Sequence, residues 1–147
     1  MRDELDQKLC VDYPKIFANR FGDMKETAMC WGFECGDGWY NILNVLCANI
    51  QHHIDWRRDR RESMLKDNPY NQPVPDEIPQ VIVDQIKEKF GTLRFYYHGG
   101  DDKIDGMVRM AESISAFTCE KCGSAGKMRG RGWLYTACDE HTKGDDI

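Results

Sequence analysis

Apolar residues at three- and four-residue steps predict helices in two parts of the N-terminal half. In the segment 3–20 they are Leu5, Leu9, Ile16 and Phe17. Pro14 is suited to the first turn of a helix, so we predict two short helices here, the second opening near this proline. A longer helix is predicted from about residue 39, with apolar residues at Trp39, Leu43, Leu46, Ile50 and Ile54.

The long helix is expected to start near Asp37, a residue type that caps helix N-termini. Beyond Ile54 the sequence is almost wholly charged, so we expect the helix to project into solvent as far as Leu65. It should end before Asn68, because four of the five prolines follow in residues 68–79 and exclude regular structure.

Residues 81–98 alternate between apolar and polar in the manner of a β-hairpin. Leu93, Phe95 and Tyr97 share one face, and Gly91 marks the turn. From Asp101 or Asp102 the period becomes helical again, and we expect this last helix to run into the cysteine at 119. A two-stranded hairpin is marginal alone and must pack on helices, so the predicted fold class is α+β, a helix-dominated single domain.

The composition agrees with a globular domain. The chain has 147 residues, of which 41% are hydrophobic and 31% charged. At this length a chain buries about 70% of its extended surface, so disulfides are not needed for stability. No apolar run approaches the roughly 18 residues of a membrane span, and the start MRDELDQKLC is too polar for a signal peptide. We therefore expect a cytoplasmic protein with no membrane contact.

Two ligand pairs near the C-terminus have the spacing of a zinc site. Cys119 and Cys122 are separated by two residues, as are Cys138 and His141, and fifteen residues lie between the pairs. Gly123 permits a tight turn just after the second thiolate. Four protein ligands complete a tetrahedron and leave no position for water, so we predict one structural Zn²⁺.

The zinc site divides the chain into a helical body with a hairpin, residues 1–118, and a zinc-ribbon tail packed on it, residues 119–147. Three thiolates and one Zn²⁺ would shift the formal charge from −5 to −6. The tail itself is locally basic and aromatic. Its Lys127, Arg129, Arg131 and Trp133 could bind nucleic acid through phosphate contacts and stacking.

Four further cysteines are expected to be buried, which is common for free thiols. Cys30 and Cys35, with His52 and His53, offer the donors of a second metal site, and this alternative stays open. Adjacent histidines on a helix face different sides, which counts against it. The four cysteines are Cys10, Cys30, Cys35 and Cys47.

His98 is the best unassigned imidazole for catalysis, because it follows a strand and precedes two glycines. We favour a turn residue, and keep a zinc-supported nuclease as an alternative. Asp101, Asp102 and Asp105 match the dipole of a helix start and need no metal. No phosphate-binding loop, Ser nucleophile motif or paired-carboxylate signature occurs, so we expect no enzyme.

The segment 29–39, MCWGFECGDGW, has three glycines and is predicted to be an irregular loop. Its Trp31, Phe33 and Trp39 form either a small core beneath the long helix, which we favour, or an exposed anchor for a protein partner.

Three segments resemble a family of small proteins carried by tailed bacteriophages and prophages. They are MCWGFECGDGW, KEKFGTLRFYYHGGD and the tail from Cys119 to His141, and the likeness as a whole covers most of the chain. KEKFGTLRFYY is the most specific part. Membership would imply a phage origin and a place in the cytoplasm of a bacterial host, without implying a particular activity.

These observations favour a non-enzymatic binding protein. Small phage proteins often act on host machinery, so we expect docking on a host protein or nucleoprotein complex, with inhibition of a host defence system as one outcome. The alternative is a nucleic-acid-binding accessory protein that uses the basic, aromatic zinc loop. The acidic net charge favours a protein partner.

Overall fold

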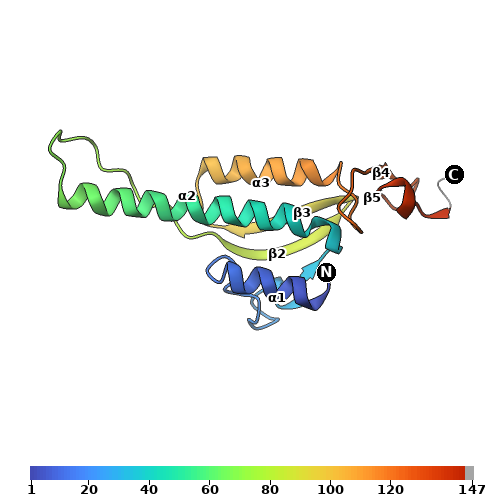
Figure 1. Ribbon diagram of the computed structural model, residues 1–147. Helices are drawn as coiled ribbons and strands as arrows, with labels where there is room; N and C mark the ends of the chain where they lie inside the picture. The colour runs from blue at the N-terminus through green and yellow to red at the C-terminus, as the bar shows by residue number, and fades with distance from the viewer. Residues whose placement is uncertain (145–147) are drawn as a thin grey trace.

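The computed structural model describes residues 1–144 and has the predicted α+β fold (Figure 1). The α-helices are α1 (Asp3–Asp12), α2 (Tyr40–Lys66) and α3 (Asp102–Ser115). Strands β1 (Phe33–Glu34), β2 (Ile82–Lys89) and β3 (Thr92–His98) form one sheet, and β4 (Lys127–Arg129) and β5 (Tyr135–Ala137) form another. Short 3₁₀ turns are η1 (Ala28–Trp31), η2 (Asp37–Trp39) and η3 (Asp139–His141).

The predicted hairpin is confirmed. β2 and β3 pair antiparallel from Ile82 opposite His98 to Lys89 opposite Thr92. The two turn residues, Phe90 and Gly91, have φ of 54° and 82°, as a type I′ hairpin turn requires. β1, in the segment predicted to be a loop, adds a parallel third strand to β2; with two residues it is too short to show alternation.

α3 covers the free edge of the sheet. The N–H groups of Leu93 and Phe95 point away from β2 and donate to Ser115 Oγ (2.9 Å) and Glu112 Oε1 (3.0 Å). These side chains occupy the edge that another strand could otherwise pair with.

The helix boundaries correct three expectations. Residues 14–20 form turns, so only the first of the two predicted N-terminal helices is present. Asp37 lies in η2, and its side chain accepts the N–H of Arg2 (2.8 Å) and does not cap α2. α3 begins as expected, with Asp101 Oδ1 accepting the N–H of Ile104 (3.1 Å), but it ends at Ser115 and does not run on to the cysteine at 119.

The core lies between the helices and the larger sheet. The apolar stripe of α2 is buried as expected, and Val83, Ile86, Leu93 and Phe95 fill the space from the sheet side. In Figure 1, α2 and α3 lie side by side, and the charged half of α2, together with the segment that follows it, extends beyond the rest of the molecule. None of the helices within residues 1–144 combines the length and apolar character that a membrane span requires.

Candidate metal centre

The four predicted ligands come together. The ligand atoms of Cys119, Cys122, Cys138 and His141 all lie within 4.8 Å of one another. His141 Nδ1 is 3.2 Å from Cys138 Sγ, and Cys122 Sγ is 3.8 Å from Cys138 Sγ. Three thiols and an imidazole at these separations can hold one metal ion and fill a tetrahedron around it.

The backbone turns at each ligand pair account for this geometry. After the first pair, Gly123 adopts a φ of 81° and donates its N–H to the carbonyl of Cys119 (2.8 Å). A residue with a Cβ would be strained there. After the second pair, η3 brings His141 back over Cys138, and the two are joined by an N–H···O bond of 3.2 Å.

Cys119 is the buried member of the cluster. Burial raises the pKa of its thiol, but backbone N–H groups, those of Cys138, Cys122 and Lys121, outweigh this and lower the pKa to about 6. A thiol that ionises readily is a better metal ligand, because the thiolate is the binding form.

The knuckle of the first ligand pair, residues 118–123, is bonded directly to the body. Glu120 accepts the N–H of Gly38 on its backbone carbonyl (2.7 Å) and the N–H of Gly36 on its carboxylate (3.0 Å). Trp39 donates its indole N–H to the carbonyl of Thr118 (2.9 Å). Partial burial beside this loop raises the pKa of Glu120. The segment 36–39 is thus the seat of the metal knuckle, a role that sequence reasoning missed because it joins residues about eighty positions apart.

The hairpin turn of the larger sheet forms a second contact with the tail. Thr136 of β5 donates its hydroxyl to the carbonyl of Gly91 (2.6 Å). A Cβ on Gly91 would meet the backbone of Leu134 and Tyr135 at 3.2–3.3 Å. Residues 119–144 of the tail thus contact the body at two places; residues 145–147 of the predicted tail lie outside the described part of the chain.

The structure does not assemble a second metal site from the remaining candidates. Within residues 1–144, the C-terminal cluster is the one group of three or more potential ligands that come together. His53 Nε2 instead lies 2.9 Å from Asp101 Oδ2. Cys35 is buried, which raises the pKa of its thiol to about 12 and disfavours ligation. Cys47 is buried as expected, whereas Cys10 and Cys30 are half-buried.

His98 is exposed and lies 3.0 Å from a carboxylate oxygen of Asp84. The prediction of a turn residue is therefore wrong: His98 is the last residue of β3 and forms a His–Asp pair with Asp84 of β2. No third ligand joins the pair within residues 1–144, so this part of the structure adds no support to the nuclease alternative.

The aromatic loop divides between core and surface. Trp39 is completely buried and Phe33 nearly so; both belong to the main hydrophobic core, where the Phe33 ring packs against that of Phe17. Neither can be the exposed anchor that was the alternative. Trp31 alone among the three is exposed, at 63%.

Of the tail residues predicted to bind nucleic acid, one is bonded within the tail and the others are exposed. Arg129 is already bonded within the tail: its guanidinium donates to the carbonyl of Ala137 (3.0 Å) and to Asp139. It braces the β4–β5 hairpin and is not free to bind a phosphate. Trp133 is 74% exposed, and Lys127 and Arg131 are exposed as well.

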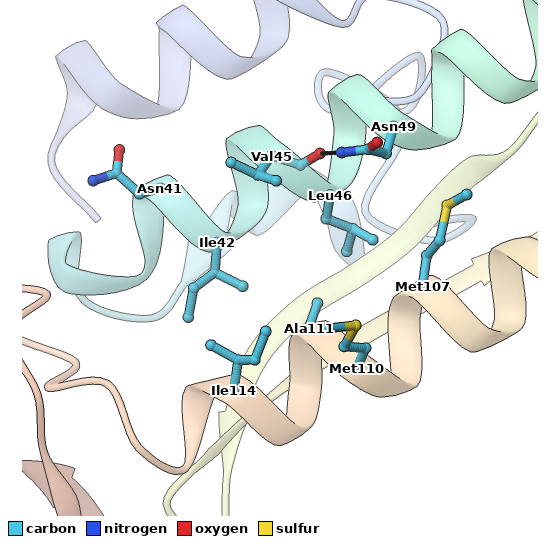
Figure 2. A pocket seen from close by; sticks show the side chains of 9 residues that line it. All are labelled: Asn41, Ile42, Val45, Leu46, Asn49, Met107, Met110, Ala111 and Ile114. Atoms are coloured by element: carbon cyan, nitrogen blue, oxygen red, sulfur yellow. Dashed lines mark hydrogen bonds between the residues drawn. The ribbon is translucent and has the colours of Figure 1, made fainter.

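A groove between α2 and α3 is an apolar surface feature that sequence reasoning missed. Figure 2 shows Ile42 and Leu46 of α2 pointing toward Ala111 and Ile114 of α3, in a groove of about 540 Å³. Its rims carry exposed apolar side chains, and none of its lining residues is charged. The lining residues are Asn41, Ile42, Val45, Leu46, Asn49, Met107, Met110, Ala111 and Ile114. Val45, an apolar residue off the buried stripe of α2, was the available signal.

Fold and site together define an α+β protein with a C-terminal Cys₃His cluster that could hold a metal ion. Comparison of the chain with protein-family models, curated proteins and solved structures gives no match. The resemblance to phage proteins therefore stays a prediction.

Proposed function

We propose that this chain is a non-enzymatic binding protein, built around one structural Zn²⁺, that docks on a protein or nucleoprotein complex of a bacterial host and thereby inhibits a host defence system. The resemblance to phage proteins supports the bacterial setting. The groove between α2 and α3 carries the binding role, because soluble proteins rarely leave contiguous apolar surface open unless it binds something.

Zinc is the metal that the donor set favours. Three thiolates and an imidazole are soft to borderline ligands, and a closed tetrahedral set of this kind is typical of structural zinc. The metal would hold the knuckle in the shape that bonds to residues 36–39. Metal analysis of purified protein should give one zinc per chain; Cys122→Ser should lose it and Cys30→Ser, outside the cluster, should keep it.

The shape of the groove favours an amphipathic helix of the partner as its occupant. Two neighbouring helices leave a trough that accepts a third, and apolar side chains at helical spacing on the partner would enter it. Val45 and Met110, 58% and 66% exposed, flank the trough and would become buried. Asn41 and Asn49 provide hydrogen-bonding groups at the rim.

Charge variants of the groove test this function. Affinity capture from bacterial lysate should recover a stoichiometric partner with the wild type and with Val11→Glu, an exposed apolar site on α1. Met110→Glu should lose it. Equal recovery by Met110→Glu would exclude the groove, and light scattering that shows a dimer broken by Met110→Glu would identify a second copy as its occupant.

A nucleic-acid-binding role is the second candidate, favoured by the distribution of charge. Residues 87–94 and 119–144 together carry a net formal charge of +4, whereas the whole chain carries −5. The rest of the sequence therefore carries −9, and the basic residues are concentrated at one end.

A further inference from the structure

The turn of the β2–β3 hairpin and the loop of the zinc ribbon form one end of the molecule, here called the tip and defined as residues 87–94 and 127–137. In Figure 1 the β2–β3 turn points toward β4 and β5. The bond from Thr136 to the carbonyl of Gly91 joins the two segments. Phe90 directly precedes Gly91, and Trp133 directly precedes Leu134, whose backbone would lie 3.3 Å from a Cβ on Gly91. Two aromatic residues far apart in sequence thus flank a single contact.

Both aromatic side chains are open to solvent. Phe90 is 67% exposed and Trp133 74% exposed. Each is held on a tight backbone turn: Phe90 has a φ of 54°, and Gly130, with a φ of 94°, packs against the carbonyl of Trp133. Exposed rings on constrained turns are poor contributors to the core of the protein but suitable platforms for a stacking ligand.

The charges around these rings are positive and available. Lys89 Nζ lies 5.6 Å from the centroid of the Phe90 ring. Within residues 1–144, neither Lys89 nor Arg131 forms an ion pair. The nearby acidic groups are already engaged: Glu88 accepts the N–H of Gly91 (2.7 Å), and Asp139 is paired with Arg129. A zinc-loaded Cys₃His centre contributes −1, so the net formal charge of residues 87–94 and 119–144 falls from +4 to +3.

We infer that the tip binds single-stranded nucleic acid, with bases stacked on Phe90 and Trp133 and phosphates near Lys89, Lys127 and Arg131. This rests on the second candidate function and adds the hairpin turn to the binding surface. Unpaired bases offer free ring faces, whereas the bases of a duplex are already stacked. An acidic protein surface would match the charge, but it would leave the two exposed rings without a function.

Fluorescence anisotropy with labelled oligo-dT and oligo-rU of about 12 nucleotides tests the inference, since that length matches typical single-strand sites. We expect binding that weakens steeply between about 50 and 200 mM salt, and weaker binding of a duplex of equal length. The variant Phe90→Asn, which tolerates positive φ, combined with Trp133→Ala should bind at least about tenfold more weakly. The two oligonucleotides distinguish DNA from RNA as the ligand.

A matched control exists on α2. Arg60 lies over the exposed ring of Trp56 (5.5 Å), but Asp55, Asp59 and Glu62 surround this pair in sequence. Trp56→Ala with Arg60→Glu should leave oligonucleotide binding unchanged, whereas Phe90→Asn with Lys89→Glu should abolish it. Circular dichroism and zinc content should be unchanged in every variant.

Three outcomes would overturn the inference: no binding by the wild type at low salt, equal binding by the tip and control variants, or equally tight binding of polyglutamate. Met110→Glu should leave oligonucleotide binding intact. A failure at the tip is therefore distinguishable from a failure of the groove.

Discussion

The indole N–H of Trp39 donates to the carbonyl of Thr118, 2.9 Å away, one residue before the first metal ligand. Trp39 is completely buried in the core of the body. The bond therefore couples the packing of the body to the position of Cys119. Loss of the metal or of the tryptophan should therefore affect both the packing of the body and the position of Cys119.

We predict that Trp39→Phe lowers the free energy of unfolding by about 1–3 kcal/mol, because the Thr118 carbonyl loses its donor in a buried setting. Trp39→Ala should cost about 3–5 kcal/mol through the added cavity. Both should weaken zinc retention against a chelator. Urea titration and chelator competition measure the two effects. Trp31→Phe, on an exposed tryptophan, should change neither; equal behaviour of Trp31→Phe and Trp39→Phe would contradict the link.

The local patterns of the sequence were sufficient for much of the fold. The stripe of α2, the alternation of β3 and the ligand spacing each involve neighbours within a few positions, so periodicity and spacing could predict them. The seat of the metal knuckle could not be predicted in this way. Gly36 and Gly38 were interpreted only as loop residues, because nothing near them in sequence indicates that their N–H groups bond to Glu120.

The error at the start of α2 and the choice left open for the aromatic loop have the same physical origin. Asp37 is suited to cap a helix, but its carboxylate is taken by the N–H of Arg2, thirty-five residues away. Phe33 and Trp39 had two possible environments, and only their inclusion in the core of the folded protein decides for burial. Where local sequence preference allowed more than one structure, contacts with residues distant in sequence thus determined which one formed.

Gly38→Ala should destabilise the protein severely, by about 2 kcal/mol or more, because backbone has to move to relieve the overlap. A Cβ there would lie 2.0 Å from the carbonyl oxygen of Cys119. Gly106→Ala is the matched control: it lies within α3 with nothing inside 4 Å of the new Cβ. That change should stabilise the protein by about 0.5–1 kcal/mol. Thermal and urea unfolding measure the stability of both variants. If Gly38→Ala lowered stability only slightly, the knuckle would not be in close contact with this loop.

Removal of the metal should loosen the tail and its seat before the rest of the body. Without the ion, three thiols and an imidazole have no common partner, and the bonds from residues 36–39 to the knuckle lose their fixed acceptor. Hydrogen exchange of chelator-treated protein should show lost protection in residues 119–141 and at Gly36 and Gly38. Protection of Leu46 and Ile50 in α2 should persist. Uniform loss over the whole chain would mean that the body depends on the metal throughout.

Asp101 should contribute to stability at neutral pH and lose that contribution in acid. Partial burial acts to raise the pKa of its carboxyl, but the bonds from His53 and from the N–H of Ile104 outweigh this and lower the pKa below the usual 3.8. A lowered pKa means that the folded protein favours the carboxylate. The contribution is therefore fully present above the ordinary pKa and is lost as the pH falls through the lowered one.

Asp101→Ala should accordingly cost about 0.5–2 kcal/mol at pH 7, the usual range for a lost N-cap. The difference from wild type should shrink as the pH falls below 3.8 and through the lowered pKa of the folded protein, where the wild-type carboxylate becomes protonated. Asp101→Asn keeps a capping oxygen and should recover most of the loss, leaving the missing charge opposite His53 as the remainder. Asp102→Ala, one position later on the exposed side of the first turn, is the control for general charge effects. If the two alanine variants lost equal stability at pH 7, the cap and the His53 contact would have no special role, and urea titrations at pH 7 and near pH 3 decide this.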